Sequence, residues 1–509
     1  MDKFDKKMFD KLYNKSSNNI KSEDLSEITK LFKEAKETQN FTNPIVKLFI
    51  KLLEVEQSPG DLGLDKEELK ELTLKHIRID EHKVSVGGRV LGALPIVKEA
   101  NSRVEEYLKI KDDEVQTGIE IWDKILENQV KIKQVLNISE KEWNSYEGQI
   151  KNAIDSVKKL SKILDLDENI IKDIARVTEH YRMRISPYYA SLIMPKTIND
   201  PILLQAVPTG EMIDNAGIEI EPVAADHSPA RLIDQFYPRV LSVKVTNMCA
   251  MYCTHCLRIA HIGDKDSIYS NNTYKEALEY IKENTNIRDV LITGGDALVL
   301  PNSKLKFLLD ELDNIDHVKV KRVGTRIPIT SPQRIDDELL EILDKSNDKK
   351  PIRLVTQINS AREITPITRD VFKKINRVTS AVLNQAVFLR GINDTKAKMW
   401  KLCETVHENY VRPYYLFNCS YRNPQFAHFR VPVEIGRDIV EGMYGNISGD
   451  AIPRYIATAG GKIPLHRSNV KEKIDNNYTL VKPWSKEEVN YPDMSIEEYK
   501  KPFSFEKYL

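Results

Sequence analysis

The 509-residue chain has little of what marks secreted or membrane-spanning proteins. It contains five cysteines, an odd and low number that argues against a disulfide framework. No uninterrupted apolar run approaches the roughly 18 residues that a membrane-spanning helix needs. The N-terminal residues also lack the apolar core of a secretory signal. We therefore expect a cytoplasmic protein with no membrane partner.

The chain also lacks a net charge, because 76 Lys and Arg residues balance 76 Asp and Glu residues. This balance gives no support to a nucleic-acid partner, which would favour a basic chain. Hydrophobic residues make up 41% and charged residues 30% of the sequence, as in ordinary globular proteins. The length suits two or three domains.

Three of the five cysteines lie in one short loop, Cys249-Ala-Met-Tyr-Cys253-Thr-His-Cys256. The loop follows a predicted strand at residues 240–246, and barrel enzymes keep their chemistry at such strand ends. Three thiolates at this spacing each reach a different iron of one cubane cluster. Clusters held by protein sulfur alone usually take four cysteines, so one iron would stay open for another ligand.

Other interpretations of this loop remain. The three cysteines would also suit a structural zinc site completed by His255 or a distant cysteine, or they are buried cysteines clustered by chance. The spacing resembles the loop of radical SAM enzymes, in which S-adenosylmethionine (SAM) binds the open iron.

From residue 240 onward, short β-rich runs recur about every 30 residues, the length of a strand plus a crossover helix. Amphipathic helical stretches separate them. This alternation predicts an α/β fold with a parallel sheet. Six units are fewer than the eight of a closed barrel, so we expect an open (β/α)6 partial barrel. The predicted strands are residues 240–246, 289–293, 320–324, 352–356, 385–389 and 411–417.

The same patterns predict four regions. Residues 1–140 would form a helical accessory extension, with helices beginning near Asn43 and Asp65 and a turn or close packing at Gly87-Gly88. Residues 141–235 would continue helical, with a turn-rich lid or connection near 185–208. Residues 236–465 would form the barrel core, and residues 466–509 a C-terminal tail.

Two glycine-containing segments carry candidate chemistry. In Thr293-Gly294-Gly295-Asp296, the glycines would let the backbone approach a ligand and Asp296 would accept hydrogen bonds from a cationic amino group. The alternative is a tight turn capped by Asp296. In Gly460-Gly461-Lys462, a lysine on a flexible hinge beside a dry cleft suits a Schiff base, because desolvation lowers its pKa. A surface turn is the alternative.

Arg258, two residues after the cysteine loop, is a candidate for binding a carboxylate with both guanidinium nitrogens. A salt bridge to a core aspartate is the alternative.

Together these sequence motifs resemble those of the lysine 2,3-aminomutase family of radical SAM enzymes that use pyridoxal 5′-phosphate (PLP). The resemblance runs from about Trp143 to about Leu465 and includes Ser186-Pro-Tyr-Tyr189, Arg412-Pro-Tyr-Tyr415 and His428-Phe-Arg430. It implies a radical SAM (β/α)6 barrel with an all-helical N-terminal region. It also implies the following site residues: Cys249, Cys253 and Cys256 for a 4Fe–4S cluster, Gly294, Gly295, Asp296 and Gln385 for SAM, Lys462 for PLP, and Arg258 for the substrate α-carboxylate.

The reaction implied by the resemblance is the isomerisation of an L-α-amino acid to a β-amino acid. A flavodoxin- or ferredoxin-type donor would reduce the cluster, and SAM cleavage would produce a radical that removes a β-hydrogen from the amino acid held on PLP. The family also implies a homo-oligomer. Two alternatives stay open: an enzyme with the same cofactors but another outcome, such as dehydration or protein-lysine modification, and a zinc-binding module without activity.

The sequence departs from lysine-specific members of this family where two aspartates grip the substrate ε-ammonium. At the first of these positions Ser420-Tyr421-Arg422 follows Cys419, and none of the three is an aspartate. At the second, shortly before Lys462, the stretch that ends at Thr458 also lacks an aspartate. An ammonium buried without a counter-charge would cost several kcal/mol. We therefore expect a substrate other than lysine.

Arg422 or Arg454 would meet a side-chain carboxylate, which makes glutamate a candidate, and a neutral side chain stays open. Ser420 and Thr458 complete the predicted substrate site. Phe236 replaces an arginine of the lysine enzymes, so the PLP phosphate would rest on Arg239 or another group.

Overall fold

The computed structural model describes residues 30, 34, 86–195, 197–215, 227–263 and 265–508. The chain divides into two units, Met1–Lys109 and Ile110–Leu509, and the second contains the barrel. The helices predicted near Asn43 and Asp65 lie outside the described residues. Across those that are described, no helix combines the length and apolar character that crossing a membrane requires.

A nine-stranded sheet forms the centre of the second unit, and its strands neighbour one another in chain order. Strands β2 to β8 are parallel, whereas β1 and β9 add an antiparallel strand at each edge. The bounds are β1 (Ile233–Tyr237), β2 (Val240–Lys244), β3 (Asp289–Thr293), β4 (Val320–Gly324), β5 (Ile352–Thr356), β6 (Ala381–Phe388), β7 (Arg412–Asn418), β8 (Arg454–Thr458) and β9 (Lys462–Pro464).

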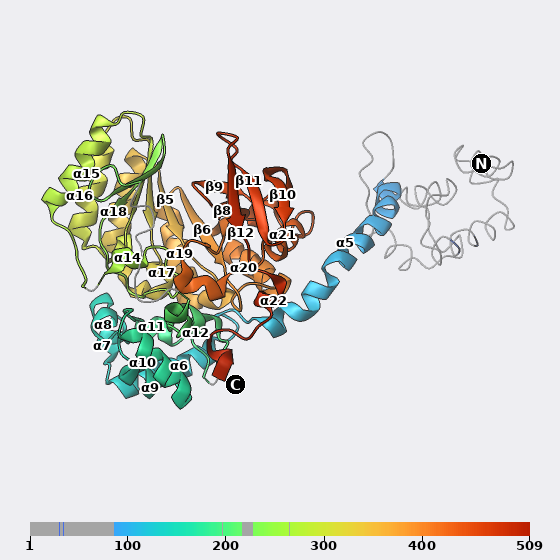
Figure 1. The fold of residues 1–509 in the computed structure, drawn as a ribbon, viewed down its shortest axis with the longest axis horizontal. Coiled ribbons are helices and arrows are strands. Elements are labelled where there is room, and N and C mark those ends of the chain that lie inside the picture. Colours follow the sequence, from blue (N-terminus) through green and yellow to red (C-terminus); the bar gives the residue numbers. More distant parts are fainter. Residues whose placement is uncertain are drawn as a thin grey trace, which may run out of the picture. The chain divides into compact units, whose positions relative to one another are not determined.

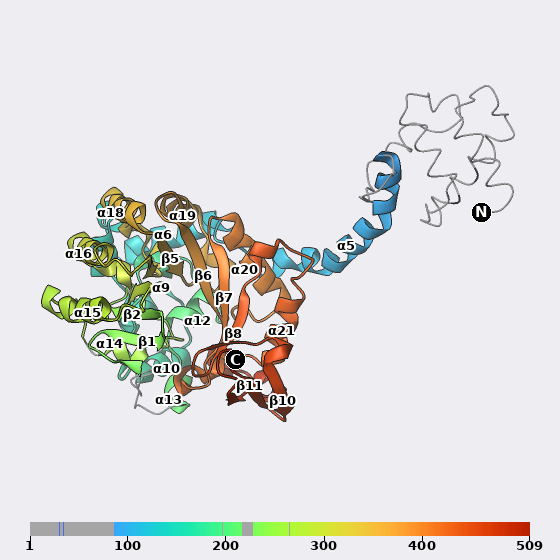
Figure 2. The same cartoon turned by 90° about the horizontal axis from the view of Figure 1, so that it is seen from above.

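The sheet is curled, and a side chain of one edge strand reaches the other edge strand. The backbone N–H of Lys462 in β9 donates to the hydroxyl of Tyr237 in β1 over 3.1 Å, although these strands stand at opposite ends of the strand order. Helices cover the outer side (Figures 1 and 2), namely α15 (Asn271–Glu283), α16 (Asn302–Asp313), α18 (Asp337–Lys349), α19 (Pro366–Val378) and α20 (Lys396–Glu408). The predicted α/β partial barrel is confirmed, but the count of six strands is wrong, because β8 adds a seventh parallel strand.

The outer helices follow the apolar spacing of the sequence. In α16 the buried residues are Leu305, Leu308, Leu309 and Leu312, one stripe at helical period. Helix α15 begins after Ser270, whose hydroxyl caps it by accepting from the N–H of Thr273. Thr273 itself lies inside the helix.

A group of short helices packs against one end of the sheet (Figure 1). It comprises α6 (Trp122–Leu136), α7 (Glu140–Trp143), α8 (Tyr146–Lys151), α9 (Val157–Ile163), α10 (Glu168–Thr178), α11 (Pro187–Ala190) and α12 (Pro201–Ala206). The lid predicted near α11 is wrong, because Tyr188 and Tyr189 are fully buried in this packing. The turn predicted at Gly87-Gly88 is also wrong. Helix α5 (Val86–Glu114) runs through both glycines, which a helix tolerates at a cost of about 1 kcal/mol each.

The C-terminal residues form more structure than a tail. Strands β10 (Val470–Ile474), β11 (Asn477–Val481) and β12 (Glu488–Pro492) make a second, antiparallel sheet that buries Tyr478, Leu480 and Tyr491. Phe503 and Phe505 then pack into the same hydrophobic cluster as helices α6 to α12. The region limits at residues 140, 235 and 465 stay predictions.

Candidate active site

The cysteine loop leaves the C-terminal end of β2 and is held by the helical region. The N–H of Thr254 donates to the carbonyl of Gln205 (3.0 Å), and its hydroxyl donates to the carbonyl of Leu204 (2.7 Å). Arg184 donates to the carbonyl of Cys249 over 3.2 Å. The helices before the barrel therefore shape the loop that carries the thiols.

The three cysteines of the loop are half-buried and lie close enough for their charges to affect one another. Burial raises the pKa of Cys249 well above its usual value, and Asp296 and the other two cysteines raise it further. Burial and the neighbouring Cys253 raise the pKa of Cys256 to about 12. Thiolates are the form that binds metal, so this site needs a cationic partner before its thiols ionise.

Within the described residues, no three His, Cys, Asp or Glu side chains gather around one metal-ion position. In a cubane cluster each cysteine binds a different iron atom. The all-sulfur donor set of the loop suits iron–sulfur chemistry, whereas His255, the proposed fourth zinc ligand, bonds to Gln357 and Asn359.

The glycine loop after β3 packs against the base of the cysteine loop. A side chain on Gly294, whose φ is +125°, would place its Cβ 2.3 Å from the carbonyl oxygen of Thr246. A Cβ on Gly295 would lie 2.3 Å from the carbonyl oxygen of Met248. The close approach that the two glycines permit is thus to the chain's own backbone, and contact with SAM stays a prediction.

Asp296 acts as a cap in this structure. Its carboxylate accepts hydrogen bonds from the hydroxyl of Thr325 (2.6 Å) and the N–H groups of Arg326 (2.6 Å) and Leu298 (3.0 Å). Leu298 lies in the 3-10 helix η4 (Ala297–Val299). The capping alternative is therefore present, and binding of an amino group by Asp296 stays a prediction.

Substituting Gly295 with alanine is expected to destabilise the protein by about 1–3 kcal/mol, because backbone atoms would have to move. The movement would also displace the start of the cysteine loop and lower the iron retained after reconstitution. Thermal denaturation and iron analysis measure both effects. Gly449→Ala is the matched control, since no atom lies within 4 Å of its added Cβ. Equal stability of the two variants would contradict the packing role.

Lys462 follows a hinge of two glycines and points into the curled sheet. Gly460 and Gly461 have φ angles of +69° and +130°, and a Cβ on Gly461 would lie 2.6 Å from the ring of Trp484. The lysine Nζ lies 4.7 Å from the ring centroid of Tyr415 and 5.7 Å from that of Phe417. Burial, and secondarily the charge of Arg322, lower the pKa of Lys462 to about 8. At pH 7 roughly one amine in ten is therefore neutral and nucleophilic, against roughly one in three thousand at the usual lysine pKa.

Arg322 and Arg326 are site residues that sequence reasoning missed. Arg322, in β4, donates from Nε to Asp289 over 2.6 Å, and its charge reaches Lys462. Arg326, just after β4, donates from Nη1 to the sulfur of Cys253 over 2.8 Å. Arg322 lies in a central parallel strand and Arg326 just beyond it. These positions were the signal in the sequence that could have identified both as site residues.

Arg258 lies beside the glycine loop. Its Nη1 donates to the hydroxyl of Thr293 (2.8 Å) and to the carbonyl of Gly294 (3.4 Å). The predicted alternative of a salt bridge to a core aspartate is wrong, since these two partners are uncharged and no ion pair of Arg258 is found among the described residues.

The remaining predicted residues lie at strand ends. Thr458 is paired directly with Lys462, and Gln385 is half-buried in β6 opposite Tyr415. Ser420 is buried and accepts from the N–H of Arg422 (3.2 Å). The Arg422 side chain is exposed beside Tyr421. The structure thus gathers Thr458 and Gln385 around the Lys462–Tyr415 pair, while Arg422 lies at the surface.

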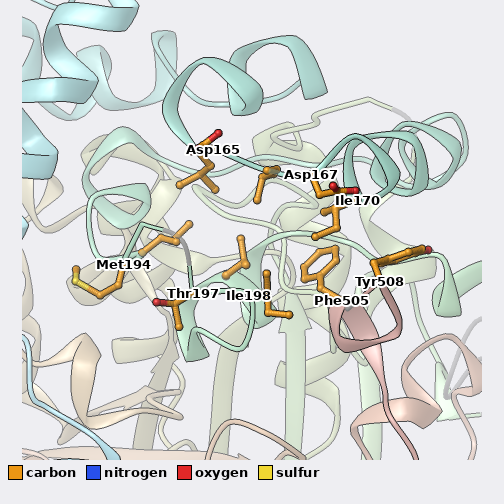
Figure 3. A pocket seen from close by; sticks show the side chains of 12 residues that line it. Asp165, Asp167, Ile170, Met194, Thr197, Ile198, Phe505 and Tyr508 are labelled. Atoms are coloured by element: carbon orange, nitrogen blue, oxygen red, sulfur yellow. The ribbon is translucent and has the colours of Figure 1, made fainter.

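A separate pocket occurs among the helices (Figure 3), away from these residues. Its lining is mostly apolar and includes no cysteine, glycine or lysine: Leu164, Asp165, Leu166, Asp167, Ile170, Ile193, Met194, Thr197, Ile198, Leu203, Phe505 and Tyr508.

Comparison with known proteins gives one consistent result. The pattern of the Radical SAM superfamily matches residues 243–403, which include the cysteine and glycine loops. A glutamate 2,3-aminomutase of Clostridioides difficile (strain 630) is 37% identical over 79% of this chain and 95% of its own length. L-lysine 2,3-aminomutases of Fusobacterium nucleatum and Clostridium subterminale are 37% and 35% identical, each over 65% of this chain and 78% and 79% of their own lengths.

The chain belongs to the radical SAM aminomutase family. A radical SAM aminomutase is an isomerase, and membership in the superfamily implies a 4Fe–4S cluster and SAM. This membership favours the cluster over structural zinc as the occupant of the three-cysteine loop, and the three ligands stay a prediction. The half-buried cysteines of the loop and the N–H donor of Arg326 fit such a cluster, because hydrogen bonds to sulfur are a common part of iron–sulfur sites.

Proposed function

We propose that this radical SAM aminomutase is a PLP-dependent glutamate 2,3-aminomutase, which moves the α-amino group of L-glutamate to Cβ. The observation that carries the proposal is Lys462. Its amine has a lowered pKa, sits against aromatic rings, and lies inside a curled sheet whose other strand ends carry the cysteine and glycine loops.

The surroundings of Lys462 fit PLP. The rings of Tyr415 and Phe417 offer apolar contact to a pyridine ring. The guanidinium of Arg322, held by Asp289 through Nε, is free at its Nη atoms of any hydrogen bond to the described residues and suits a phosphate. Arg239, the candidate that the sequence suggested, is exposed. When bound, PLP supplies a conjugated system that delocalises an unpaired electron beside the migrating nitrogen.

The second half of the site would bind the cluster and SAM. Cys249, Cys253 and Cys256 would hold the cluster, while the glycine loop and Gln385 would position SAM. A flavodoxin- or ferredoxin-type protein would supply the electron, and a homo-oligomer is proposed from the family. When bound, the cluster and SAM supply the radical that removes a β-hydrogen.

Arginines would bind both the α-carboxylate and the side-chain carboxylate of the glutamate substrate. Among the described residues Arg258 bonds to uncharged groups alone, so its charge is available to the α-carboxylate. Arg454 lies with its Cζ 6.0 Å from the ring centroid of Tyr415, the same ring that lies 4.7 Å from the Lys462 amine. Both Arg422 and Arg454 are exposed, and it is this shared neighbour that favours Arg454 as the partner of a side-chain carboxylate. Ser420 and Thr458 provide no counter-charge for a lysine ammonium.

Anaerobic incubation with each proteinogenic amino acid, SAM, PLP and dithionite tests the proposal. Chromatography with mass spectrometry is expected to show 3-aminoglutarate from glutamate and no β-lysine from lysine. Arg454→Gln is expected to raise KM for glutamate roughly 10- to 100-fold, the worth of one charge-assisted hydrogen bond.

Arg369→Gln, at an exposed arginine of α19, is the matched control and is expected to leave KM unchanged. Conversion of lysine in preference to glutamate would reject the substrate, and an unaltered KM in Arg454→Gln would reject the role of Arg454.

A further inference from the structure

Arg326 connects the sulfur of one cluster cysteine to a buried carboxylate. Only 11% of its side chain is exposed. Nη1 donates to the sulfur of Cys253 (2.8 Å), while Nη2 donates to Glu363 (2.6 Å), Gln205 (3.1 Å) and the hydroxyl oxygen of Tyr189 (3.3 Å). The guanidinium is thus fixed from one side and offers its other side to sulfur.

Glu363 is the anchor of this arrangement. Its side chain is fully buried, and besides Arg326 it accepts hydrogen bonds from the hydroxyl of Tyr189 (2.8 Å) and the N–H groups of Asn359 (2.7 Å) and Ser360 (2.9 Å). With four donors on two oxygens, the carboxylate is held in one orientation. Arg326 is therefore held in one position rather than free to choose another partner.

We propose that Arg326 is a positioning residue that raises the reduction potential of the cluster, and that Glu363 limits the size of this effect. In reduction, one electron passes from the low-potential protein donor to the cluster, and the cluster becomes more negative by one charge. An N–H donor and a cation beside a ligand sulfur stabilise the reduced cluster more than the oxidised one. A buried carboxylate acts in the opposite direction, and weak screening makes both effects large here.

A purely structural role for the pair predicts something different. Arg326 and Glu363 also tie the end of β4 to α11, α12 and the 3-10 helix η6 (Ala361–Glu363), so removing either side chain would lower stability. A structural tie would not shift the potential of an intact cluster in opposite directions for the two partners. The sign of the shift therefore separates the two roles.

The test uses the full chain after anaerobic reconstitution, with the EPR signal of the reduced cluster followed against solution potential. Arg326→Met is expected to shift the midpoint to more negative potential, and Arg326→Lys to restore part of the difference. Glu363→Gln keeps the donor, removes the buried negative charge, and is expected to shift the midpoint to more positive potential. Iron and sulfide content show that each cluster is intact.

Lys321 of β4 and Asp313 of α16 provide the matched control, because they form a buried ion pair on the helix-covered side of the strand that precedes Arg326. Lys321→Met and Asp313→Asn are expected to change stability without moving the midpoint. If Arg326→Met incorporates little iron, Arg326→Lys and Glu363→Gln still give the two signs. Midpoints that do not move, or that move in the same direction in the Arg326 and Glu363 variants, would overturn the proposal.

Discussion

Replacing Lys462 with alanine is expected to remove aminomutase activity by at least about 10³-fold, the scale on which a positioned reacting group contributes to rate. The variant loses the one buried amine on the glycine hinge, so PLP would bind weakly and without a covalent bond. Borohydride reduction followed by peptide mass spectrometry would find a pyridoxyl group on Lys462 of the native protein. The variant would carry none.

Lys482→Ala is the control for Lys462. This lysine lies close to the same hinge, within 3.5 Å of where a Cβ on Gly460 would be, but it pairs with Glu487. It is expected to retain PLP and activity. If Lys462→Ala still carried covalent pyridoxyl label, or if the label appeared on Lys482, the assignment of the PLP lysine would be wrong.

Replacing Cys253 with alanine is expected to have an effect of similar size, through the cluster. One of three ligands is lost, and the Arg326 guanidinium that donates to its sulfur keeps only its bonds to Glu363, Gln205 and Tyr189. Iron and sulfide per chain should fall well below those of the native protein after reconstitution. Cleavage of SAM to 5′-deoxyadenosine should become undetectable.

The control for this variant is Cys403→Ala, another buried cysteine, which lies in α20. It is expected to destabilise the fold by about 2 kcal/mol or less, as a small cavity does, and to keep a full cluster. A Cys253→Ala protein with native iron content and SAM cleavage would show that the three-cysteine interpretation is wrong.

Local patterns predicted much of the barrel. Strands β3, β4 and β5 begin and end at the predicted residues, and α16 follows its leucine stripe. These elements depend on the alternation of apolar side chains with turn residues over short stretches of chain. The cysteine loop was equally local, because three ligands within eight residues are visible without any knowledge of the fold.

Contacts between distant segments were not predictable in this way. The meeting of β1 with β9 joins Tyr237 to Lys462 across 225 residues, and it depends on the summed twist of the whole sheet. The bond from Arg326 to Cys253 spans 73 residues. A buried arginine has no distinguishing periodicity, so its partner sulfur becomes visible only when the strand ends are in place.

The glycine loop shows a third limit. The residues of Gly294-Gly295-Asp296 were recognised as special, but a close approach to a ligand and one to the chain's own backbone require the same amino acids. Likewise, a carboxylate that caps η4 and one that awaits an amino group look identical in a sequence. Only the partners of Asp296 distinguish them.

The proposed chemistry requires that the cluster loop and Lys462 serve one and the same site. Its most direct test is isotope transfer from L-glutamate deuterated at C3, incubated anaerobically with the reconstituted protein, SAM, PLP and dithionite. We expect deuterium in the methyl group of 5′-deoxyadenosine, and its absence in the Lys462→Ala variant. Deoxyadenosine without deuterium from the native protein, or deuterium transfer that survives the loss of Lys462, would contradict a shared site.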